Sequence, residues 1–276
     1  ADPDPLTDPS PTVASDTASA PSAGDATPYT LYFVGDTPRG PRLFSEERLR
    51  RSEGDLMTAL TALSSTPYDP DYRTYWFDGA FTGASFDGVG ADGQISVRLC
   101  CSSFHDRPVG MSELQAQLAV ESVIWTLQSA LAPDGEPVRA AVQFYLGDNP
   151  IDQVYGVPTS EPLANGSSSE VLSQMSISSP AEGARVSDSF VAEGANNGFE
   201  ATMTWQLLDA TGAVALDGFA TAEGWGEDRL FPWRTDPIDV SGLAPGSYTF
   251  VAANDDPSGG SEGSGPDTDT RSITVE

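Results

Sequence analysis

The stretch SELQAQLAVESVIWTLQSAL, residues 112–131, decides the fold of the first half of the chain. Ser112 is a favoured N-cap, and after it apolar residues recur at the spacing of an α-helix. One helical face carries Ala116, Val120, Val123, Ile124, Leu127 and Leu131, and the opposite face carries Leu114, Leu118 and Trp125. The stretch therefore predicts a long helix with two apolar faces. One face should pack on a sheet, and a different element should cover the other.

Alternating residues on both sides of this helix predict the strands of that sheet. Apolar and polar residues alternate over 95–101 before the helix and over 138–146 after it, up to a break at 147–150. This period of two is typical of half-buried strands. Residues 68–93, rich in Gly and aromatic side chains, are interpreted as loops and extended chain.

A hairpin and a second helix are predicted upstream. Residues 30–34 form a buried-strand pattern that can pair with 43–50 across the turn at 37–40. Ser52 and Asp55 have capping-box spacing, and an apolar helical face follows before Pro67. That face consists of Leu56, Ala59, Leu60 and Leu63. Residues 29–164 are therefore predicted to form a small mixed-sheet α/β domain with two main helices.

The pattern changes after a linker at residues 165–174, which is rich in Ser, Asn and Gly at 165–169. No helical periodicity follows, and short alternating runs occupy 175–178, 190–193, 201–208, 213–220, 247–252 and 271–275. Residues 209–212 predict a hairpin turn, and Trp205 is the candidate for the central core aromatic. Residues 175–276 are therefore predicted to be an all-β immunoglobulin-like sandwich, which makes the whole chain α+β.

Residues 1–28 contain no aromatic and no basic side chain and consist mainly of Pro, Ala, Ser, Thr and Asp. Such a segment cannot bury enough apolar surface to fold, so we expect a disordered acidic tether. This composition often follows a processed export signal. We therefore expect an extracytoplasmic protein, either secreted or a bacterial lipoprotein whose only membrane contact is a lipid anchor N-terminal to the tether.

The net charge of −28 arises from 41 acidic and 13 basic residues, and all of the basic residues are Arg. A field of this sign repels phosphate backbones and anionic lipids, which argues against nucleic-acid binding. The expected partner is another envelope protein, and the alternative is a cell-wall glycan.

The reactive side chains do not form a known catalytic motif. His105 is the only histidine, which excludes multi-His metal sites. Cys100 and Cys101 lie near it, which leaves open a Cys/His nucleophile pair or a thiolate-imidazole metal site. Cys101 is in phase with the apolar side of its strand, so structural thiols or a disulfide between the two neighbours are favoured.

No nucleophile elbow, phosphate-binding loop, dinucleotide fingerprint or zinc-protease helix is present, so no catalytic residue, metal or cofactor is predicted. Acidic pairs at 69 and 71, at 255 and 256, and at 267 and 269 leave calcium open, although none has the EF-hand pattern. The sequence favours a non-enzymatic protein, and an envelope hydrolase with paired carboxylates is the least favoured alternative.

Two clusters could bind a partner. Five arginines gather around the predicted hairpin and could hold an acidic protein surface, unless Glu46, Glu47 and Glu53 neutralise them. They are Arg39, Arg42, Arg48, Arg50 and Arg51. An aromatic loop could offer a platform to a glycan or a partner, unless its rings serve the core. Its residues are Trp225, Phe231 and Trp233.

Two family resemblances follow from these segments. Residues 30–164 resemble the GerM N-terminal (GerMN) domain of sporulation and spore-germination proteins, through the strand at 31–34, the segments 43–48, 92–97 and 142–147, and Tyr155-Gly156. Residues 175–276 resemble the immunoglobulin-like domain of bacterial spore germination, through 177–180, 191–195, Trp205 and 218–220. The resemblance implies an envelope protein with a scaffolding or binding role and transfers no catalytic residue.

Overall fold

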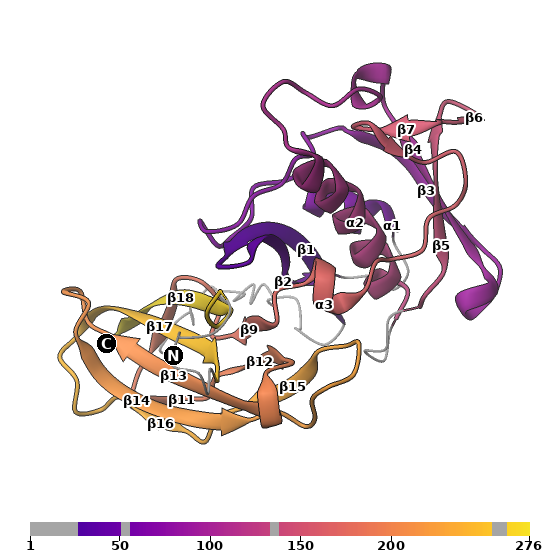
Figure 1. The fold of residues 1–276 in the computed structure, drawn as a ribbon. Coiled ribbons are helices and arrows are strands. Elements are labelled where there is room, and N and C mark those ends of the chain that lie inside the picture. Colours follow the sequence, from indigo (N-terminus) through magenta and orange to yellow (C-terminus); the bar gives the residue numbers. More distant parts are fainter. Residues whose placement is uncertain (1–26, 51–55, 133–137, 256–263) are drawn as a thin grey trace, which may run out of the picture.

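The computed structural model describes residues 27–50, 56–132, 138–255 and 264–276. It shows an α+β region with two main helices, followed by a β-rich immunoglobulin-like region, as the sequence predicts (Figure 1). Residues 1–26 and 51–55 lie outside the described residues, and with them most of the predicted tether, Arg51 and the predicted capping box of Ser52 and Asp55. Residues 27 and 28, which were assigned to the tether, belong instead to the first strand, Thr27–Thr37. Within the described residues, no helix is both long and apolar enough to cross a membrane.

A four-stranded sheet of order β3-β4-β5-β6 forms the back of the first domain. The central strands β4 and β5 are parallel, and both other pairings are antiparallel. The parallel pair requires a crossover connection, which the long helix α2 supplies. The strands are β3 (Phe81–Asp87), β4 (Gln94–Leu99), β5 (Ala141–Leu146) and β6 (Asn149–Pro150).

Two helices cover this sheet. α2 (Glu113–Ala130) begins at Ser112, whose hydroxyl accepts from the Gln115 amide while the Gln115 side chain accepts from the Ser112 amide. This reciprocal capping box explains why the helix starts there. α1 (Leu56–Leu63) buries the four residues of its predicted apolar face. Both helices contribute to a core that includes Trp76, Phe104 and Phe144.

The remaining elements of the first domain include a long hairpin and several short segments. The hairpin strands β1 (Thr27–Thr37) and β2 (Gly40–Arg50) pair along their whole length, which confirms the predicted pairing. The short elements are η2 (Gly90–Asp92), η3 (Ser102–Phe104), β7 (Gln153–Val154) and β8 (Val157–Pro158).

The second domain is a sandwich of a five-stranded sheet, of order β10-β18-β17-β13-β14, and a three-stranded sheet, of order β15-β12-β9. The first consists of β10 (Ala184–Val186), β13 (Thr202–Leu208), β14 (Val214–Thr221), β17 (Gly246–Asn254) and β18 (Thr268–Val275). The second consists of β9 (Met175–Ser179), β12 (Glu193–Asn196) and β15 (Phe231–Arg234). A two-stranded sheet of β11 (Ser189–Phe190) and β16 (Ile238–Asp239) and the turn η4 (Phe199–Ala201) complete it.

Four local predictions were wrong or incomplete. Residues 81–87 form strand β3 rather than a loop, because Phe81 and its neighbours pair with β4 across a register shift. Strands β10, β15 and β16 are too short to show a periodic pattern. Trp205 lies on the same face of β13 as the buried Met203 and Leu207 and packs against the core, but it is only half-buried, and Trp233 is the buried tryptophan instead. Strand β5 begins at Ala141 rather than at 138.

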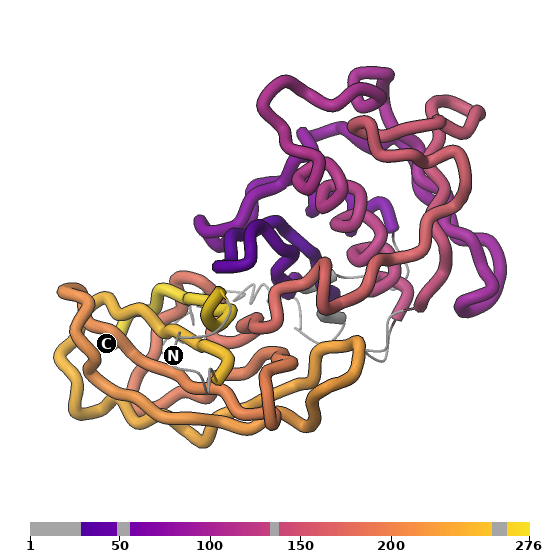
Figure 2. The backbone as a smooth tube through the Cα atoms, viewed as in Figure 1, coloured from indigo at the N-terminus to yellow at the C-terminus, as the bar shows by residue number. Residues whose placement is uncertain are grey.

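The junction between the domains covers the second apolar face of α2 at Leu118 and Trp125, whereas Leu114, which was predicted on the same face, is 38% exposed. Leu118 and Trp125 pack with Val34 and Leu43 of the hairpin and with two residues of the segment around α3 (Ser168–Val171), Val171 and Leu172. The predicted linker therefore contains a helical turn that packs against the first domain. In Figure 2 the chain passes through this segment directly into β9, so the hairpin and the sandwich lie side by side.

Candidate functional site between the two domains

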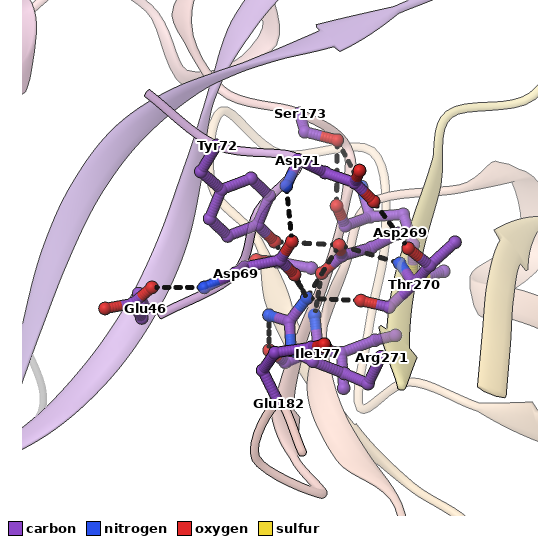
Figure 3. A network of polar contacts seen from close by, with 12 residues as sticks. Glu46, Asp69, Asp71, Tyr72, Ser173, Ile177, Glu182, Asp269, Thr270 and Arg271 are labelled. Carbon is purple, nitrogen blue, oxygen red and sulfur yellow. Dashed lines mark hydrogen bonds and ion pairs between the residues drawn. The ribbon is translucent and has the colours of Figure 1, made fainter. Parts of the chain in front are cut away.

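A buried ionic joint connects the two domains (Figure 3). It consists of Arg271 and Asp269 of β18 and of Asp69 and Tyr72 of the first domain. One guanidinium nitrogen, Nη1, donates to Asp69 Oδ2 at 2.5 Å, to Asp269 Oδ1 at 3.0 Å and to the Tyr72 hydroxyl at 3.1 Å. The Tyr72 hydroxyl in turn donates to Asp269 Oδ1 at 2.7 Å. Because Asp69 and Tyr72 belong to the first domain, these bonds hold the two domains together.

Local sequence explains how the second domain supplies its half of the joint. Asp269 and Arg271 alternate with Thr270 on β18, so their side chains share one face of the strand. The Ile177 carbonyl accepts from Arg271 Nη2, and the Ile177 amide donates to Asp269 Oδ2, both at 2.6 Å. The guanidinium therefore satisfies two buried carboxylates and several carbonyls, which a buried charge requires.

Burial sets the electrostatics of this joint. It raises the pKa of Asp69 to about 6, against the attraction of Arg271, which lowers it. Burial also raises the pKa of Asp269, and burial together with the Asp269 carboxylate raises the pKa of Tyr72. Tyr72 thus remains a neutral hydroxyl that can donate.

A second ionic contact lies at the tip of the hairpin. Arg39 donates from Nε to Asp267 Oδ1 at 3.2 Å and from Nη2 to Asp267 Oδ2 at 2.5 Å. The Gln174 amide also donates to Oδ2 at 2.8 Å, and Asp267 is buried. Such a bidentate pair fixes the direction of the guanidinium as well as its position.

The acidic pairs that left calcium open therefore have a different role. Asp69 and Asp269 share Arg271, Asp267 binds Arg39, and Asp71 accepts from the Thr270 hydroxyl at 2.9 Å. Asp255 lies at the edge of a segment outside the described residues, and Asp256 lies within it. In the part of the chain that the structure describes, no group of three or more His, Cys, Asp and Glu side chains could hold a metal ion.

Of the five predicted partner-binding arginines, the three whose side chains the structure describes make contacts within the chain itself. Arg39 binds the chain's own second domain, and Arg48 pairs with Glu46 at 2.7 Å and lies 3.8 Å from the Tyr68 ring centroid. Arg42 donates to the Pro41 carbonyl at 2.8 Å. The side chain of Arg50 and the whole of Arg51 lie outside the described residues.

Beside the joint lies a cleft with a volume of about 870 Å³, which both domains line. Its first wall is the outer face of the hairpin, where the register pairs Thr30 with Glu47 and Tyr32 with Ser45. The opposite wall is the outer face of the three-stranded sheet, and Trp125 and Arg139 also line the cleft. The sheet residues that line it include Ser176, Ser178, Glu193, Ala195, Pro232 and Arg234.

The cleft is rich in hydroxyls and locally balanced in charge. Its lining contains three glutamates and three arginines, among them the ion pair of Arg234 with Glu193. Arg139 Cζ lies 4.6 Å from the centroid of the Trp125 ring, and the centroids of the Tyr32 and Trp125 rings are 5.6 Å apart. Glu47 is exposed to the cleft, yet partial burial between the walls raises the pKa of its carboxyl. The cleft thus differs in charge from the strongly acidic molecule around it.

The three predicted platform aromatics are separated by the fold. Phe231 and Trp233 are 5% and 3% exposed, because alternate residues of β15 face the sandwich core. Trp225 is 50% exposed, and its neighbour is Phe199, with ring centroids 5.2 Å apart. Phe199 gave no signal in the sequence because it lies in an irregular turn.

The two cysteines are free thiols at the surface. Strand β4 ends at Leu99, so Cys101 does not continue the buried face as predicted and is only half-buried at the edge of the core. The sulfurs are 2.8 Å apart, and Cys101 Sγ lies 3.1 Å from Ser103 Oγ. His105 contacts Asp106 and Asp152 at 2.8 and 3.1 Å, and these carboxylates, Asp106 foremost, raise its pKa.

The comparison with protein families concerns the second domain. No curated protein matches the chain. Among solved structures, CopC from Methylosinus trichosporium OB3b is 20% identical with a TM-score of 0.25, and the alignment covers 37% of this chain and 93% of that one. The resemblance of residues 30–164 to the GerM N-terminal domain stays a prediction. Residues 174–261 match the family model of the immunoglobulin-like domain of bacterial spore germination, and the second domain carries that domain.

Proposed function

We propose that this protein is a non-enzymatic recognition module of a bacterial cell envelope, which binds an extended segment of another envelope protein in its interdomain cleft. The observation that supports this function best is the cleft itself, because both domains build it and the buried joint fixes its walls.

The dimensions of the cleft suit ligand binding. Its volume of about 870 Å³ lies within the ~300–1,000 Å³ of typical ligand pockets, which form preferentially at domain interfaces. The joint and the hairpin contact fix both walls before a ligand arrives. A preformed site binds more tightly because less conformational entropy is lost when the ligand binds.

The chemistry of the walls favours a polypeptide over a polyanion. Hydroxyls of Thr30, Ser178 and Thr221 can bond to a peptide backbone, and glutamates and arginines of the lining can pair with side chains of either sign. A strongly anionic ligand would meet the repulsion of a chain with net charge −28.

The location outside the cytoplasm and the membership of a sporulation or germination lipoprotein family are part of this proposal. They are supported by the Pro- and Ala-rich composition of residues 1–28 and by the match of residues 174–261 to a spore-germination domain. The location is tested by protease treatment of cells whose cytoplasmic membrane is intact and whose outer layers let the protease through. We expect the protein to be digested while a cytoplasmic marker survives.

Site-specific photocrosslinking tests the cleft. A photoreactive amino acid is placed at Thr30, on the hairpin wall, or at Ser178, on the sheet wall, and the control position is the exposed Ser247 of β17. In cells that make the protein, we expect both cleft positions to yield the same discrete adduct and Ser247 to yield none.

A variant that fills the cleft provides a second test by photocrosslinking. Ser178→Trp in the Thr30 crosslinking background should remove the adduct, whereas Ser247→Trp should leave it unchanged. Adducts of equal yield from Ser247, or an adduct that survives filling of the cleft, would show that the partner binds elsewhere.

A further inference from the structure

Phe199 and Trp225 form an exposed aromatic pair outside the cleft. The two side chains are 49% and 50% exposed and meet edge to face, with centroids 5.2 Å apart. They come from different loops, the turn before β13 and the segment before β15. Large aromatic rings that meet at a surface expose apolar area that a soluble protein normally buries or uses for binding.

The loops that carry these rings are fixed by hydrogen bonds. The Asn197 side chain accepts from the Gly226 amide and donates to the Glu227 carbonyl, both at 2.8 Å, so it joins the two loops. Asp228 Oδ1 accepts from the hydroxyls of Ser167 and Ser168 at 2.7 Å, which ties the second loop to α3. Solvent-exposed rings are thus presented by an ordered frame.

The turn after Phe199 adopts a strained backbone. Glu200 and Ala201 have φ values of 53° and 60°, in the left-handed region that costs non-glycine residues about 1 kcal/mol or more each. Such strain persists where the surrounding structure requires it and often marks a binding site. Here it directs the chain so that Phe199 faces solvent beside Trp225.

The aromatic pair borders a hollow of about 600 Å³ whose other walls are polar. The lining contains the hydroxyls of Ser167 and Ser169, the amides of Gln174 and Asn197, and the carboxylates of Glu227 and Asp228. None of these lining residues, all of which the structure describes, is basic. Hydrogen bonds from Ser168 and Ser167 lower the pKa of Asp228, so this carboxylate remains an acceptor at neutral pH.

This combination of groups selects one class of ligand. Aromatic faces pack against the C–H faces of pyranose rings, while carboxylates, amides and hydroxyls bond to sugar hydroxyls. Glu227 is paired with Arg229 at 2.9 Å, but the Asp228 carboxylate and the net charge of −28 disfavour uronic acids, phosphates and other anions. We propose that the hollow beside Phe199 and Trp225 is a binding site for an uncharged glycan, distinct from the protein-binding cleft and independent of it.

Isothermal titration calorimetry with two soluble probes tests this site: a hexamer of N-acetylglucosamine and a hexamer of glucose. We expect the full chain to bind at least one of them, and Phe199→Ala and Trp225→Ala each to weaken that binding tenfold or more. The matched control is Phe219→Ala, because Phe219 is 74% exposed but lies on β14, away from the hollow. The control should change affinity less than twofold, and circular dichroism checks that all variants fold.

Several outcomes would overturn the proposal. They are the absence of binding to both hexamers at millimolar concentration, full binding by Trp225→Ala, or an equal loss in Phe219→Ala. Displacement of the bound hexamer by millimolar tetramethylammonium would identify a cation site instead. Because Ser178→Trp fills the cleft and not the hollow, it should leave glycan affinity unchanged, so failure of one proposal does not imply failure of the other.

Discussion

Substitution of Arg271 by Met should destabilise the association of the two domains strongly. The guanidinium is 4% exposed and donates five hydrogen bonds, to Asp69, Tyr72, Asp269, and the carbonyls of residues 270 and 177. Met retains most of the apolar stem but leaves two buried carboxylates without a counter-charge. Removing one partner of a buried ion pair typically costs about 3–5 kcal/mol, and we expect a loss of this size near neutral pH.

Urea unfolding, followed by circular dichroism and by tryptophan fluorescence, measures this loss. The matched control is Arg185→Met, because Arg185 pairs with Glu276 at the surface and its side chain is 73% exposed. An exposed ion pair contributes about 0–1 kcal/mol, so the control should unfold close to the wild-type midpoint.

A triple variant tests whether the loss of stability comes from the two carboxylates that Arg271→Met leaves without a counter-charge. Replacing Asp69 and Asp269 by Asn in the Arg271→Met background removes the uncompensated charges and should recover a large part of the lost stability. A loss below about 1 kcal/mol for Arg271→Met, or a triple variant no more stable than the single one, would show that the joint contributes little.

Three further predictions concern single residues. The pKa of Asp69 is raised to about 6 from an ordinary value of 3.8, so its contribution to stability is complete below pH 3.8 and is lost as pH rises through 6. Relative to Asp69→Asn, the unfolding free energy of the wild type should thus fall by about 3 kcal/mol between pH 4 and 7. Urea titrations of both proteins at these pH values measure this, and a difference between the two that does not change with pH would contradict it. Gly194→Ala should cost more than about 2 kcal/mol in the same assay, because a Cβ would overlap the Ser176 carbonyl and the Trp233 ring, and a near-neutral result would be unexpected. Ser112→Ala removes the cap of α2 and should cost about 1 kcal/mol, whereas Ser112→Asp should restore the midpoint.

Elements with a clear local period could be predicted from the sequence. The helix over 113–130 follows from its cap and its apolar spacing, and even its second apolar face indicated a covering element, which is the segment around α3. Strand β3 was missed because Gly and aromatic residues obscure its alternation, and its pairing with β4 includes a register shift. Strand β15 has only four residues, too few to show that Phe231 and Trp233 point inward while Arg234 points into the cleft.

The joint could not be predicted because its partners are 202 positions apart in the sequence. The acidic pairs were visible and left a calcium site open, but a single sequence does not show that the cation beside them is an arginine of the same chain. Likewise, Arg39 was expected to hold an acidic protein surface, and the structure brings it to Asp267 of the chain's own second domain. A clue was present at 269–271, where an acid and an arginine alternate on one strand face.

The joint uses charges, although apolar residues often replace buried ion pairs without loss of stability, and its geometry suggests why. The ion pairs of Arg271 with Asp69 and of Asp267 with Arg39 attach the segment 267–271 to the first domain at two separate points. In addition, β2 runs beside the chain entering β9, where the Ser173 amide donates to the Leu43 carbonyl at 2.8 Å. Apolar contacts are non-directional and permit small rotations, whereas bidentate and buried ionic bonds permit one orientation. These two ionic attachments and the backbone hydrogen bond together fix the angle between the hairpin and the three-stranded sheet, and this angle sets the width of the cleft. Loosening Arg39 should therefore alter the binding of a partner in the cleft even though Arg39 does not line it.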